Sequence, residues 1–569
     1  VGVTVNLSDA QHGSQAAHTA TDTFGASDTL TSIEEVFGTM QNDVIFGSTD
    51  GGYNGFWGLG GNDTLVGGAH DTWAYYHRDQ DFGGTAGVVV NLSDVLHGTQ
   101  AARSATDGFG DTDTLDNIDK VRGTVHADIV YGNGTNNQFQ LLDGNDFVDG
   151  GNGNDMVDYS RDNRSGTAVH GVFANLSGQA QASFLGTVAA GSAIGLFGDI
   201  DSLVSIEEVM GSEFADVMVA VNDPEKYQGF WGLAGNDTIA GGGKNTWVYY
   251  FDDASFGGGG GVVVNLSDVS QGGQAAHTAT DGFGSTDTLF NVGSVMGTAQ
   301  ADVFYGDQNK NQFELNRGDD FVDGGAGEDL VNYSTDNDGS ATHGVFVNLS
   351  DFTTTSQLGT VGPHSAIGVY GDVDTLLNIE EAIGSEFDDV LVAVADPEKY
   401  QGFWGLAGND EIRGGGVNTW AYYDLDASFG GTNGVVVNLS SLQQGGQAAN
   451  SATDGFGDTD QLLNVGSVKA TALDDVIYGN ANANQFELGA GNDFVDGGAG
   501  DDTVNYSFDD DGSATHGALV NLSGQTFTTP LGTVGPRSAN GQYGDFDTLL
   551  NIENAIGSDF ADRHIGNGQ

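Results

Sequence analysis

Aspartate and asparagine side chains recur every nine residues between positions 128 and 155, and this ladder restricts the fold more than any other feature of the chain. Its rungs are Asp128, Asn137, Asp146 and Asp155. An apolar residue stands two places after each rung, namely Val130, Phe139, Val148 and Val157. An apolar residue at a fixed place in a short unit is typical of a repeat that buries its core by stacking unit on unit.

The same ladder returns twice more in the same register. Its further copies are Asp302, Asn311, Asp320 and Asp329, and Asp475, Asn484, Asp493 and Asp502. Glycines precede the aspartates, and glycine adopts the positive φ angles that let a tight turn aim several carbonyls at one point. Calcium takes roughly six to eight oxygen ligands from carboxylates and carbonyls. The pattern therefore predicts calcium-binding turns, and an acidic glycine-rich linker is the less favoured alternative because the apolar residues keep register.

Successive nonapeptides are expected on opposite edges of a flattened coil of two sheets, so that Asp128 stacks on Asp146 and Asn137 on Asp155. Stacked carboxylates repel one another unless a cation lies between them. The predicted calcium-binding residues of the three ladders are Asp128, Gly144, Asp146, Gly151, Gly153, Asp155, Asp302, Gly318, Asp320, Gly325, Gly327, Asp329, Asp475, Gly491, Asp493, Gly498, Gly500 and Asp502. Weaker turns elsewhere add Asp43, Asp63, Asp216, Asp237, Asp389 and Asp410.

At these residues the chain resembles the haemolysin-type, or RTX, calcium-binding repeat proteins. The resemblance is strongest in GNDFVDGGNGND at 144–155 and GNDFVDGGAGDD at 491–502. It implies an all-β fold of parallel β-roll or β-helix modules in tandem, several bound Ca²⁺ ions, and export from a bacterium by type I secretion. The C-terminal signal for such export is not visible in this sequence.

The charge balance points in the same direction. The chain has 80 acidic and 15 basic residues, a formal net charge of −65, 93 glycines and no cysteine. Self-repulsion of this size opposes compaction, so we expect the fold to depend on a divalent cation. A polyanion should also repel nucleic acid and anionic lipid surfaces, and no apolar run is long enough to insert in a bilayer. The absence of cysteine fits a secreted bacterial protein without disulfides.

A longer repeat is superimposed on the nonapeptides. A strand-like block such as VVVNLS occurs seven times, with its asparagine at Asn6, Asn91, Asn175, Asn265, Asn348, Asn438 and Asn521. Alternation of apolar and polar residues predicts a half-buried strand with the asparagine on the polar face. Beyond the first copy, every second step is 173 or 174 residues, which indicates two alternating unit types.

The expected domains follow from this alternation. They are a mixed unit at 1–83, first-type units at 84–168, 258–341 and 432–514, second-type units at 169–257 and 342–431, and a truncated second-type unit at 515–569. Because both ends fall inside a repeat, we expect the chain to be a fragment of a larger secreted or surface protein. The segment DTLLNIEEAIG at 374–384 has helical propensity, but its place before a repeat favours further solenoid turns.

Second-type units depart from the calcium pattern. An aspartate is expected nine residues after each of Asp63, Asp237 and Asp410, but these positions hold Thr72, Thr246 and Thr419. A hydroxyl is a poorer calcium ligand than a carboxylate, so these turns are expected to end the ion column, with the TWAYY and TWVYY segments as an aromatic cap. A sugar-binding platform built on Trp57 and Trp73 is the alternative.

No constellation for catalysis is found, and the chain is not expected to be an enzyme. It has no H-E-x-x-H zinc motif and no cysteine nucleophile. His18 corresponds to Arg103, His277 and Asn450 in sister copies, which favours a surface role. Each N-L-S is formally a glycosylation sequon, but the repeated asparagines are interpreted as structural.

The leading hypothesis is a calcium-stabilised extracellular β-solenoid array with a structural, adhesive or surface-assembly role, through self-association or contact with neighbouring copies. The first alternative is the calcium-binding carrier region of a larger secreted enzyme or toxin. The second is a module that binds cell-surface glycans through its aromatic segments.

Overall fold

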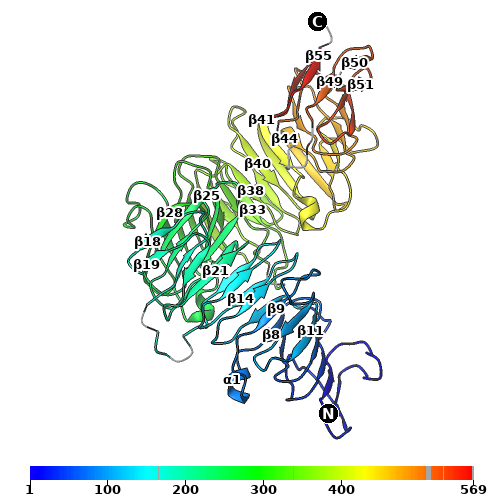
Figure 1. The fold of residues 1–569 in the computed structure, drawn as a ribbon. Coiled ribbons are helices and arrows are strands. Elements are labelled where there is room, and N and C mark those ends of the chain that lie inside the picture. Colours follow the sequence, from blue (N-terminus) through cyan, green and yellow to red (C-terminus); the bar gives the residue numbers. More distant parts are fainter. Residues whose placement is uncertain are drawn as a thin grey trace. The chain divides into compact units, whose positions relative to one another are not determined.

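The computed structural model is almost entirely β-structure, as the sequence predicts (Figure 1). It describes residues 1–163, 166–168, 170–337, 339–507, 514, 516–529 and 531–566. The chain divides into two compact units, Val1–Val295 and Met296–Gln569, and each is described by itself. In both, short strands pair along two ladders, a first and a second, through hydrogen bonds between successive coils.

In Val1–Val295 the two ladders are joined by the long strand β25 (Thr238–Tyr249), which pairs with a strand of each. The first ladder contains β1 (Thr4–Asn6), β2 (Thr19–Thr21), β3 (Ser27–Thr29), β5 (Val44–Phe46), β7 (Thr64–Val66), β9 (Val89–Asn91), β10 (Ser104–Thr106), β11 (Thr112–Asp116), β13 (Ile129–Tyr131), β15 (Phe147–Asp149), β17 (Phe173–Asn175), β20 (Ser192–Ile194), β21 (Ile200–Val204), β23 (Val217–Val219), β26 (Val263–Asn265), β27 (Thr278–Thr280) and β28 (Thr286–Met296). The second contains β4 (Glu35–Phe37), β6 (Asn54–Trp57), β8 (Thr72–Tyr75), β12 (Lys120–Arg122), β14 (Gln138–Gln140), β16 (Met156–Asp158), β22 (Glu208–Met210) and β24 (Gln228–Trp231).

Met296–Gln569 repeats this plan, with β41 (Glu411–Tyr422) and β44 (Thr459–Lys469) running through both ladders. Its first ladder contains β29 (Val303–Tyr305), β31 (Phe321–Asp323), β33 (Phe346–Asn348), β36 (Ser365–Ile367), β37 (Val373–Leu377), β39 (Val390–Val392), β42 (Val436–Asn438), β43 (Ser451–Thr453), β45 (Val476–Tyr478), β47 (Phe494–Asp496), β49 (Leu519–Asn521), β52 (Ser538–Asn540), β53 (Phe546–Leu550) and β55 (Arg563–Ile565). Its second contains β30 (Gln312–Glu314), β32 (Leu330–Asn332), β38 (Glu381–Ile383), β40 (Gln401–Trp404), β46 (Gln485–Glu487), β48 (Thr503–Asn505) and β54 (Asn554–Ile556).

A few small elements lie outside the ladders. Three hairpins pair β18 (Gln181–Ser183) with β19 (Gly186–Val188), β34 (Thr354–Ser356) with β35 (Gly359–Val361), and β50 (Phe527–Thr529) with β51 (Gly532–Val534). Single helical turns occur at α1 (Asp79–Phe82), η1 (Asp253–Phe256) and η2 (Asp426–Phe429). No helix among the described residues is both long and apolar enough to cross a membrane.

The register confirms the predicted coil of two nonapeptides. Strand β13 pairs in parallel with β15, and β14 with β16, so that residues eighteen apart lie side by side. The apolar residue of each nonapeptide points into the core: Val130, Phe139, Val148 and Val157 are completely buried. The segment 374–384 also forms solenoid strands as expected, because it supplies most of β37 and all of β38.

Antiparallel pairs interrupt the parallel stacking. The chain runs through β9, turns back through β10, and turns again into β11, with both contacts antiparallel. The strands β17, β20 and β21 repeat this arrangement, as do β42, β43 and β44. The insertions that distinguish the unit types therefore enter the sheet itself.

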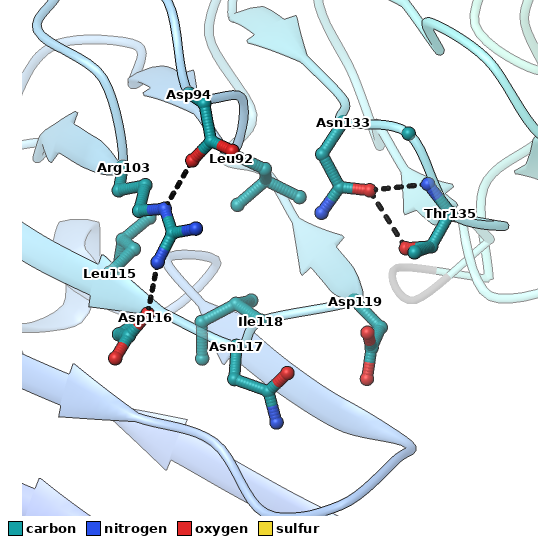
Figure 2. Close-up of a pocket in the computed structure, with 11 residues that line it drawn as sticks. Leu92, Asp94, Arg103, Leu115, Asp116, Asn117, Ile118, Asp119, Asn133 and Thr135 are labelled. Atoms are coloured by element: carbon teal, nitrogen blue, oxygen red, sulfur yellow. Dashed lines mark hydrogen bonds and ion pairs between the residues drawn. The ribbon is translucent and has the colours of Figure 1, made fainter.

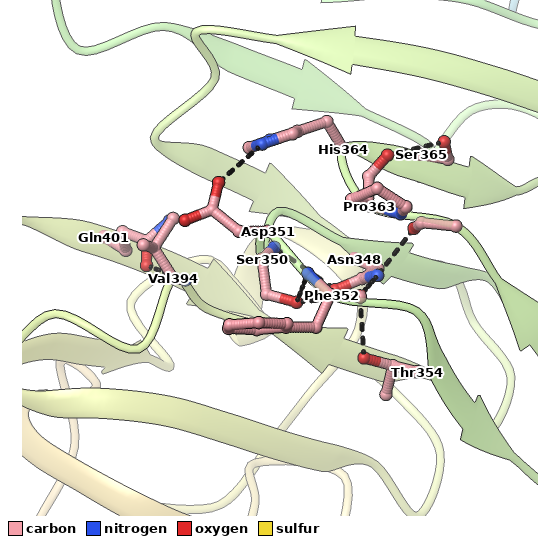
Figure 3. A network of polar contacts seen from close by, with 11 residues as sticks. Asn348, Ser350, Asp351, Phe352, Thr354, Pro363, His364, Ser365, Val394 and Gln401 are labelled. Atoms are coloured by element: carbon pink, nitrogen blue, oxygen red, sulfur yellow. Dashed lines mark hydrogen bonds and ion pairs between the residues drawn. The ribbon is translucent and has the colours of Figure 1, made fainter.

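The repeated asparagine follows a different rule from the one expected. All seven copies are completely buried, so the polar side of this strand is not exposed to solvent. In Asn348 the side-chain amide donates to the carbonyls of Phe352 (2.8 Å) and Gly362 (2.6 Å), while its oxygen accepts from the Ser350 hydroxyl (2.6 Å), as Figure 3 shows. The asparagine thus holds the following insertion loop closed, in agreement with its structural interpretation.

The aromatic cap is corrected by the strand order. The TWAYY segment forms β8, which lies between β6 and β12 in the second ladder, so it continues the coil and does not end it. The coil continues because the backbone of Lys120 pairs with that of Trp73, 47 residues away along the chain. Two of the expected domain boundaries, at Val169 and Thr515, and the final residues 567–569 lie outside the described residues. The division into seven units stays a prediction.

Candidate metal centre

Aspartates form columns along the edge of the first ladder. The backbone N–H of Asp128 donates to Oδ1 of Asp146 (2.7 Å), and that of Asp146 donates to Oδ1 of Asp201 (3.1 Å). Unit Met296–Gln569 contains the same contacts from Asp475 to Asp493 (2.8 Å) and from Asp493 to Asp547 (3.2 Å). The predicted stacking of Asp128 on Asp146 is therefore confirmed.

Among the described residues, six of these columns contain three aspartates each. The complete sets are Asp43, Asp63 and Asp113; Asp128, Asp146 and Asp201; Asp216, Asp237 and Asp287; Asp302, Asp320 and Asp374; Asp389, Asp410 and Asp460; and Asp475, Asp493 and Asp547. Sequence reasoning missed the third members, which are 50 to 55 residues beyond the second. In the sequence, each third member is the first residue of a D-x-L segment, such as DTL at 113–115.

The opposite edge is more varied. Asn137 donates from its backbone to Oδ1 of Asp155 (2.8 Å), as predicted, and Asp155 donates to the carboxylate of Glu207 (3.3 Å). The corresponding contacts link Asn484 to Asp502 and Asp502 to Glu553. This edge therefore carries fewer aspartates than the first.

The predicted aspartates separate into two classes by the state of their oxygens. In the first class, both oxygens already accept hydrogen bonds. Asp128 accepts from the backbone N–H groups of Val88 (2.7 Å) and Thr124 (2.6 Å) and from the Thr124 hydroxyl (2.8 Å). Asp43, Asp216, Asp389 and Asp475 do the same. Asp302 also belongs to this class, because its two oxygens accept from the N–H and the hydroxyl of Thr298. These side chains hold the loop at the start of each column.

The second class leaves an oxygen without a partner. In each member, Oδ1 accepts a backbone N–H while Oδ2 has no hydrogen bond. Each of these residues is at most 2% exposed, so water does not reach the unpaired oxygen freely. The members are Asp63, Asp146, Asp155, Asp237, Asp320, Asp329, Asp410, Asp493 and Asp502. A buried, unpaired carboxylate oxygen costs several kcal/mol unless a proton or a metal neutralises it. The second class therefore has the donor oxygens that a calcium ion requires.

Glycines shape the space around these oxygens. A Cβ on Gly150 would lie 2.5 Å from Oδ2 of Asp155, and one on Gly153 would lie 2.8 Å from the carbonyl oxygen of Thr135 in the adjoining turn. All the predicted turn glycines have positive φ, from 91° to 145°, and these are Gly144, Gly151, Gly153, Gly318, Gly325, Gly327, Gly491, Gly498 and Gly500. The turns thus bring backbone carbonyls next to the unpaired carboxylates.

Burial and like charges shift these carboxyl groups toward the protonated form. Burial, with the charges of Asp128 and Asp201, raises the pKa of Asp146 to about 10. The pKa values of Asp320 and Asp493 are raised to about 10 for the same reasons. On the other edge the pKa of Asp155 rises to about 7, mainly through burial. Without a cation, each column therefore favours bound protons over free charge.

The residues fit calcium better than a metal held by side chains alone. Among the described residues, no group of three or more His, Asp or Glu side chains converges to hold an ion. A site here would combine one or two carboxylates with backbone carbonyls, which suits the hard calcium ion and its oxygen ligands. The bound ion would supply positive charge between the stacked layers.

One hollow on the surface contains exposed ion pairs. This hollow, shown in Figure 2 and about 370 Å³ in volume, contains Arg103, whose guanidinium donates to Asp94 (2.5 Å) and Asp116 (2.7 Å). His18 and His277, in the corresponding positions, pair with Asp9 and Asp268 in the same way. These are exposed ion pairs beside a turn, as the surface interpretation expects.

Comparison with known families gives one match. The family model of the RTX calcium-binding nonapeptide repeat (4 copies) matches residues 122–163, 230–245, 294–322, 305–339, 403–418 and 470–511. These segments contain the unpaired aspartates Asp146, Asp155, Asp237, Asp320, Asp329, Asp410, Asp493 and Asp502. No curated protein matches the chain.

Proposed function

The chain is an RTX calcium-binding repeat protein, and we propose that calcium folds it outside the cell into a structural array with an adhesive or surface-assembly role. The observation that carries this proposal is the set of buried carboxylate oxygens without partners along both edges. Calcium binding in several copies follows from the repeats themselves. The residues of the second class are our proposed ligands.

The physical basis is a switch between two environments. With a net charge of −65 and buried carboxylates in columns, the metal-free fold is opposed by self-repulsion and by desolvation. Extracellular calcium modules bind with dissociation constants of about 10⁻⁴ to 10⁻³ M. The chain would thus remain expanded in a low-calcium cytosol, pass through a type I secretion system, and fold in the medium.

Exposed apolar side chains favour contacts between copies. Val95, Val269 and Leu442 follow the repeated N-L-S block at the same position and are 60%, 58% and 70% exposed. Their backbone carbonyls accept the amide of the buried asparagine, at 2.8 to 2.9 Å, so each tip is held in place. These side chains recur at the same place in the sequence repeat, and we propose them as the repeated contacts between copies.

The glycan alternative has less support. Trp57 and Trp73 are 6% and 7% exposed, and Trp57 is stacked between the rings of Phe37 and Tyr75. Trp73 stacks on Tyr75 and lies under the ammonium group of Lys120, so the protein's own side chains contact both indole rings. The carrier of a secreted enzyme is the alternative that the following experiment separates from assembly.

The test is sedimentation velocity with circular dichroism on the same samples, first in EGTA and then at rising calcium concentration. We expect β signal to appear with calcium, followed by large particles. A triple variant, Val95→Ser, Val269→Ser and Leu442→Ser, should fold with calcium but stay monomeric. Folding without any assembly of the parent chain would favour the carrier role, and no gain of β signal would contradict the proposed calcium switch.

A further inference from the structure

The aspartate edge of the first ladder is interrupted wherever the antiparallel strands enter. Between Asp113, at the start of β11, and Asp128, before β13, lie the strands β10 and β9. Neither belongs to a nonapeptide, and the family match begins only at residue 122. Asp107 directly follows β10 and therefore lies at this edge, inside the interruption.

Asp107 is buried beside a second aspartate that the nonapeptide pattern does not include. Asp79 and Asp107 are each 1% exposed. Oδ2 of Asp79 accepts the N–H of Gly108 (3.0 Å), and a Cβ on Gly108 would lie 2.9 Å from Cβ of Asp79. Oδ1 of Asp79 and Oδ2 of Asp107 have no hydrogen-bond partner. Two buried, unpaired carboxylate oxygens thus belong to neighbouring side chains, close enough for the charge of Asp107 to raise the pKa of Asp79.

Neighbouring groups fix this pair in place. The other oxygen of Asp107 accepts the N–H groups of Phe109 (3.0 Å) and Asp111 (2.7 Å), which closes the turn after β10. Asp79 lies three residues after Tyr76, whose hydroxyl donates to Asp113 (3.4 Å). Both oxygens of Asp113 are thereby engaged, one by Tyr76 and one by the N–H of Asp63. Asp79 and Asp107 therefore keep one unpaired oxygen each, next to the unpaired Oδ2 of Asp63 in the column.

The same pair recurs in Met296–Gln569. Asp426 and Asp454 are 1% and 0% exposed, Gly455 donates to Oδ2 of Asp426 (2.9 Å), and Tyr423 donates to Asp460 (3.0 Å). Oδ1 of Asp426 and Oδ2 of Asp454 lack partners, as in the first unit. Because the same contacts occur in both units, the aspartate pair is a regular feature of the repeat.

Second-type units supply the second carboxylate of the pair from a different position. Where first-type units have Asp107 or Asp454, a second-type unit has Gly368, and the carboxylate comes from Asp372 four residues later. A Cβ on Gly368 would lie 2.5 Å from Oδ2 of Asp372, so the glycine makes room for this side chain. All four carboxylate oxygens of Asp336, which is 5% exposed, and Asp372 lack partners.

We propose that each of these pairs is a further divalent-cation site, of calcium by its oxygen chemistry, that carries the metal-binding edge across the antiparallel strands. The pairs are Asp79 with Asp107, Asp336 with Asp372, Asp426 with Asp454, and Asp162 with Asp199, where Oδ1 of Asp162 and both oxygens of Asp199 are buried without a partner. Backbone carbonyls and water complete the coordination, as hard cations require. The inference rests on the proposed function, because it assumes that calcium is the ion present when the chain folds.

The chain contains a matched control for the test. Asp22 follows β2 and accepts the N–H groups of Phe24 (2.9 Å) and Ala26 (2.8 Å), the same turn that Asp107 makes. Asp22 is half-buried, and neither of its oxygens is among the buried oxygens without a partner, so it lies outside the proposed pairs. Asp107→Asn and Asp22→Asn therefore remove the same turn carboxylate, with and without a proposed site.

Native mass spectrometry of the full chain in calcium counts the bound ions. We expect Asp107→Asn and Asp336→Asn each to bind one ion fewer than the parent chain, and Asp22→Asn to bind the same number. Equal ion counts in all four proteins would overturn the inference and leave the nonapeptide sites, and thus the proposed function, intact. A parent chain that binds no calcium would instead refute both.

Crystals of the parent chain grown with terbium provide the second measurement, which does not require a variant to fold. An anomalous peak between Asp79 and Asp107 is expected, in addition to those at the nonapeptide turns. Peaks at the turns alone would contradict the proposed site.

Discussion

At the scale of single residues, the division of the aspartates into two classes assigns them different tasks. Asp128 accepts hydrogen bonds at both oxygens and holds a loop, whereas Asp146 leaves one oxygen unpaired. The two side chains are successive members of one column, and the nine-residue period alone assigns them the same role. Their substitutions should therefore have different consequences.

Asp146→Asn should weaken the response to calcium without preventing folding at saturating calcium. The amide removes one charged ligand, and even the loss of an outer-shell partner lowers metal affinity by roughly 10- to 100-fold. We expect the calcium midpoint for β structure, measured by circular dichroism, to rise by about 10-fold or more in the affected coil. Asp94→Asn, at an exposed ion pair, should leave the midpoint in place, and an unchanged midpoint in Asp146→Asn would exclude it as a ligand.

Asp128→Asn should instead destabilise the loop at any calcium concentration. Its amide nitrogen cannot accept from Thr124 or Val88, and hydrogen bonds to a charged group contribute about 1.5–3 kcal/mol each. Urea denaturation at saturating calcium should show this loss. A calcium midpoint shifted without loss of stability would assign Asp128 to the ligands.

Stability of the metal-free protein should fall as the pH rises from 5 to 8. An unfolded aspartate has a pKa of about 3.9, while that of Asp146 in the fold is about 10. Between these values the folded state binds more protons, so its stability is complete below the lower pKa and is lost toward the higher one. Each fully shifted carboxyl group contributes about 1.4 kcal/mol per pH unit.

The measurement is the β signal of metal-free samples, followed by circular dichroism from pH 8 down to pH 5, where protonation of the buried carboxyl groups should stabilise the fold. The triple variant Asp146→Asn, Asp320→Asn and Asp493→Asn removes the groups whose pKa values are raised most, and its stability should depend less on pH. Equal pH dependence of this variant and the parent chain would show that the columns do not carry the effect.

Sequence alone identified the unpaired nonapeptide aspartates, because a nine-residue period fixes both the turn and the buried apolar residue. It did not identify Asp79 and Asp107, which are 28 residues apart and meet only because β10 runs antiparallel. The third members of the columns were missed for a similar reason, since their partners lie at least 50 residues away. A nine-residue period predicts contacts within a coil, but it does not predict contacts between segments that are far apart in the chain.

At the scale of elements, the insertions are held by one buried asparagine each. Asn91 donates to the carbonyls of Val95 (2.8 Å), Gln100 (3.3 Å) and Ala101 (2.9 Å) and accepts from Ser93. The alternation in VVVNLS predicted a polar face in solvent, but the loop folds over this face and supplies its hydrogen-bond partners. The strand was therefore predicted correctly and its surroundings were not.

Asn91→Ala should open the loop between β9 and β10 while the rest of the coil stays folded. Unsatisfied buried groups cost about 1–3 kcal/mol each, so hydrogen exchange in residues 92–103 should become roughly 10- to 100-fold faster. Asn222→Ala, at an exposed position, should leave exchange unchanged. Uniformly faster exchange over the whole unit would indicate instead that the loop and the coil unfold together.

The aromatic strands show a second limit at this scale. Thr72 occupies the place of an aspartate, which suggested an end to the column and a cap. The edge nevertheless continues, because the backbone N–H of Thr72 donates to Asp119 (3.4 Å) and β8 pairs with β12. Loss of one ligand in a rung does not end a coil whose strands still find backbone partners.

At the scale of the whole molecule, the question is whether calcium acts by binding in sites or by screening a charge of −65. Screening depends on ionic strength and not on the identity of the cation. Site binding depends on geometry: calcium accepts irregular oxygen shells at about 2.3–2.6 Å, whereas magnesium demands a near-octahedral shell at about 2.0–2.1 Å and gives up water reluctantly. Turns built from carbonyls and single carboxylates suit the first ion.

Calcium should therefore fold the chain where magnesium and sodium do not. Circular dichroism in millimolar CaCl₂, in MgCl₂ at the same concentration, and in NaCl at matched ionic strength compares the three directly. We expect full β signal only with calcium, and a partial gain at most with NaCl because screened repulsion leaves the buried oxygens of Asp146 and its equivalents unpaired. Equal folding in all three salts would mean that net charge alone opposes the fold, and the columns would then need no ion between their layers.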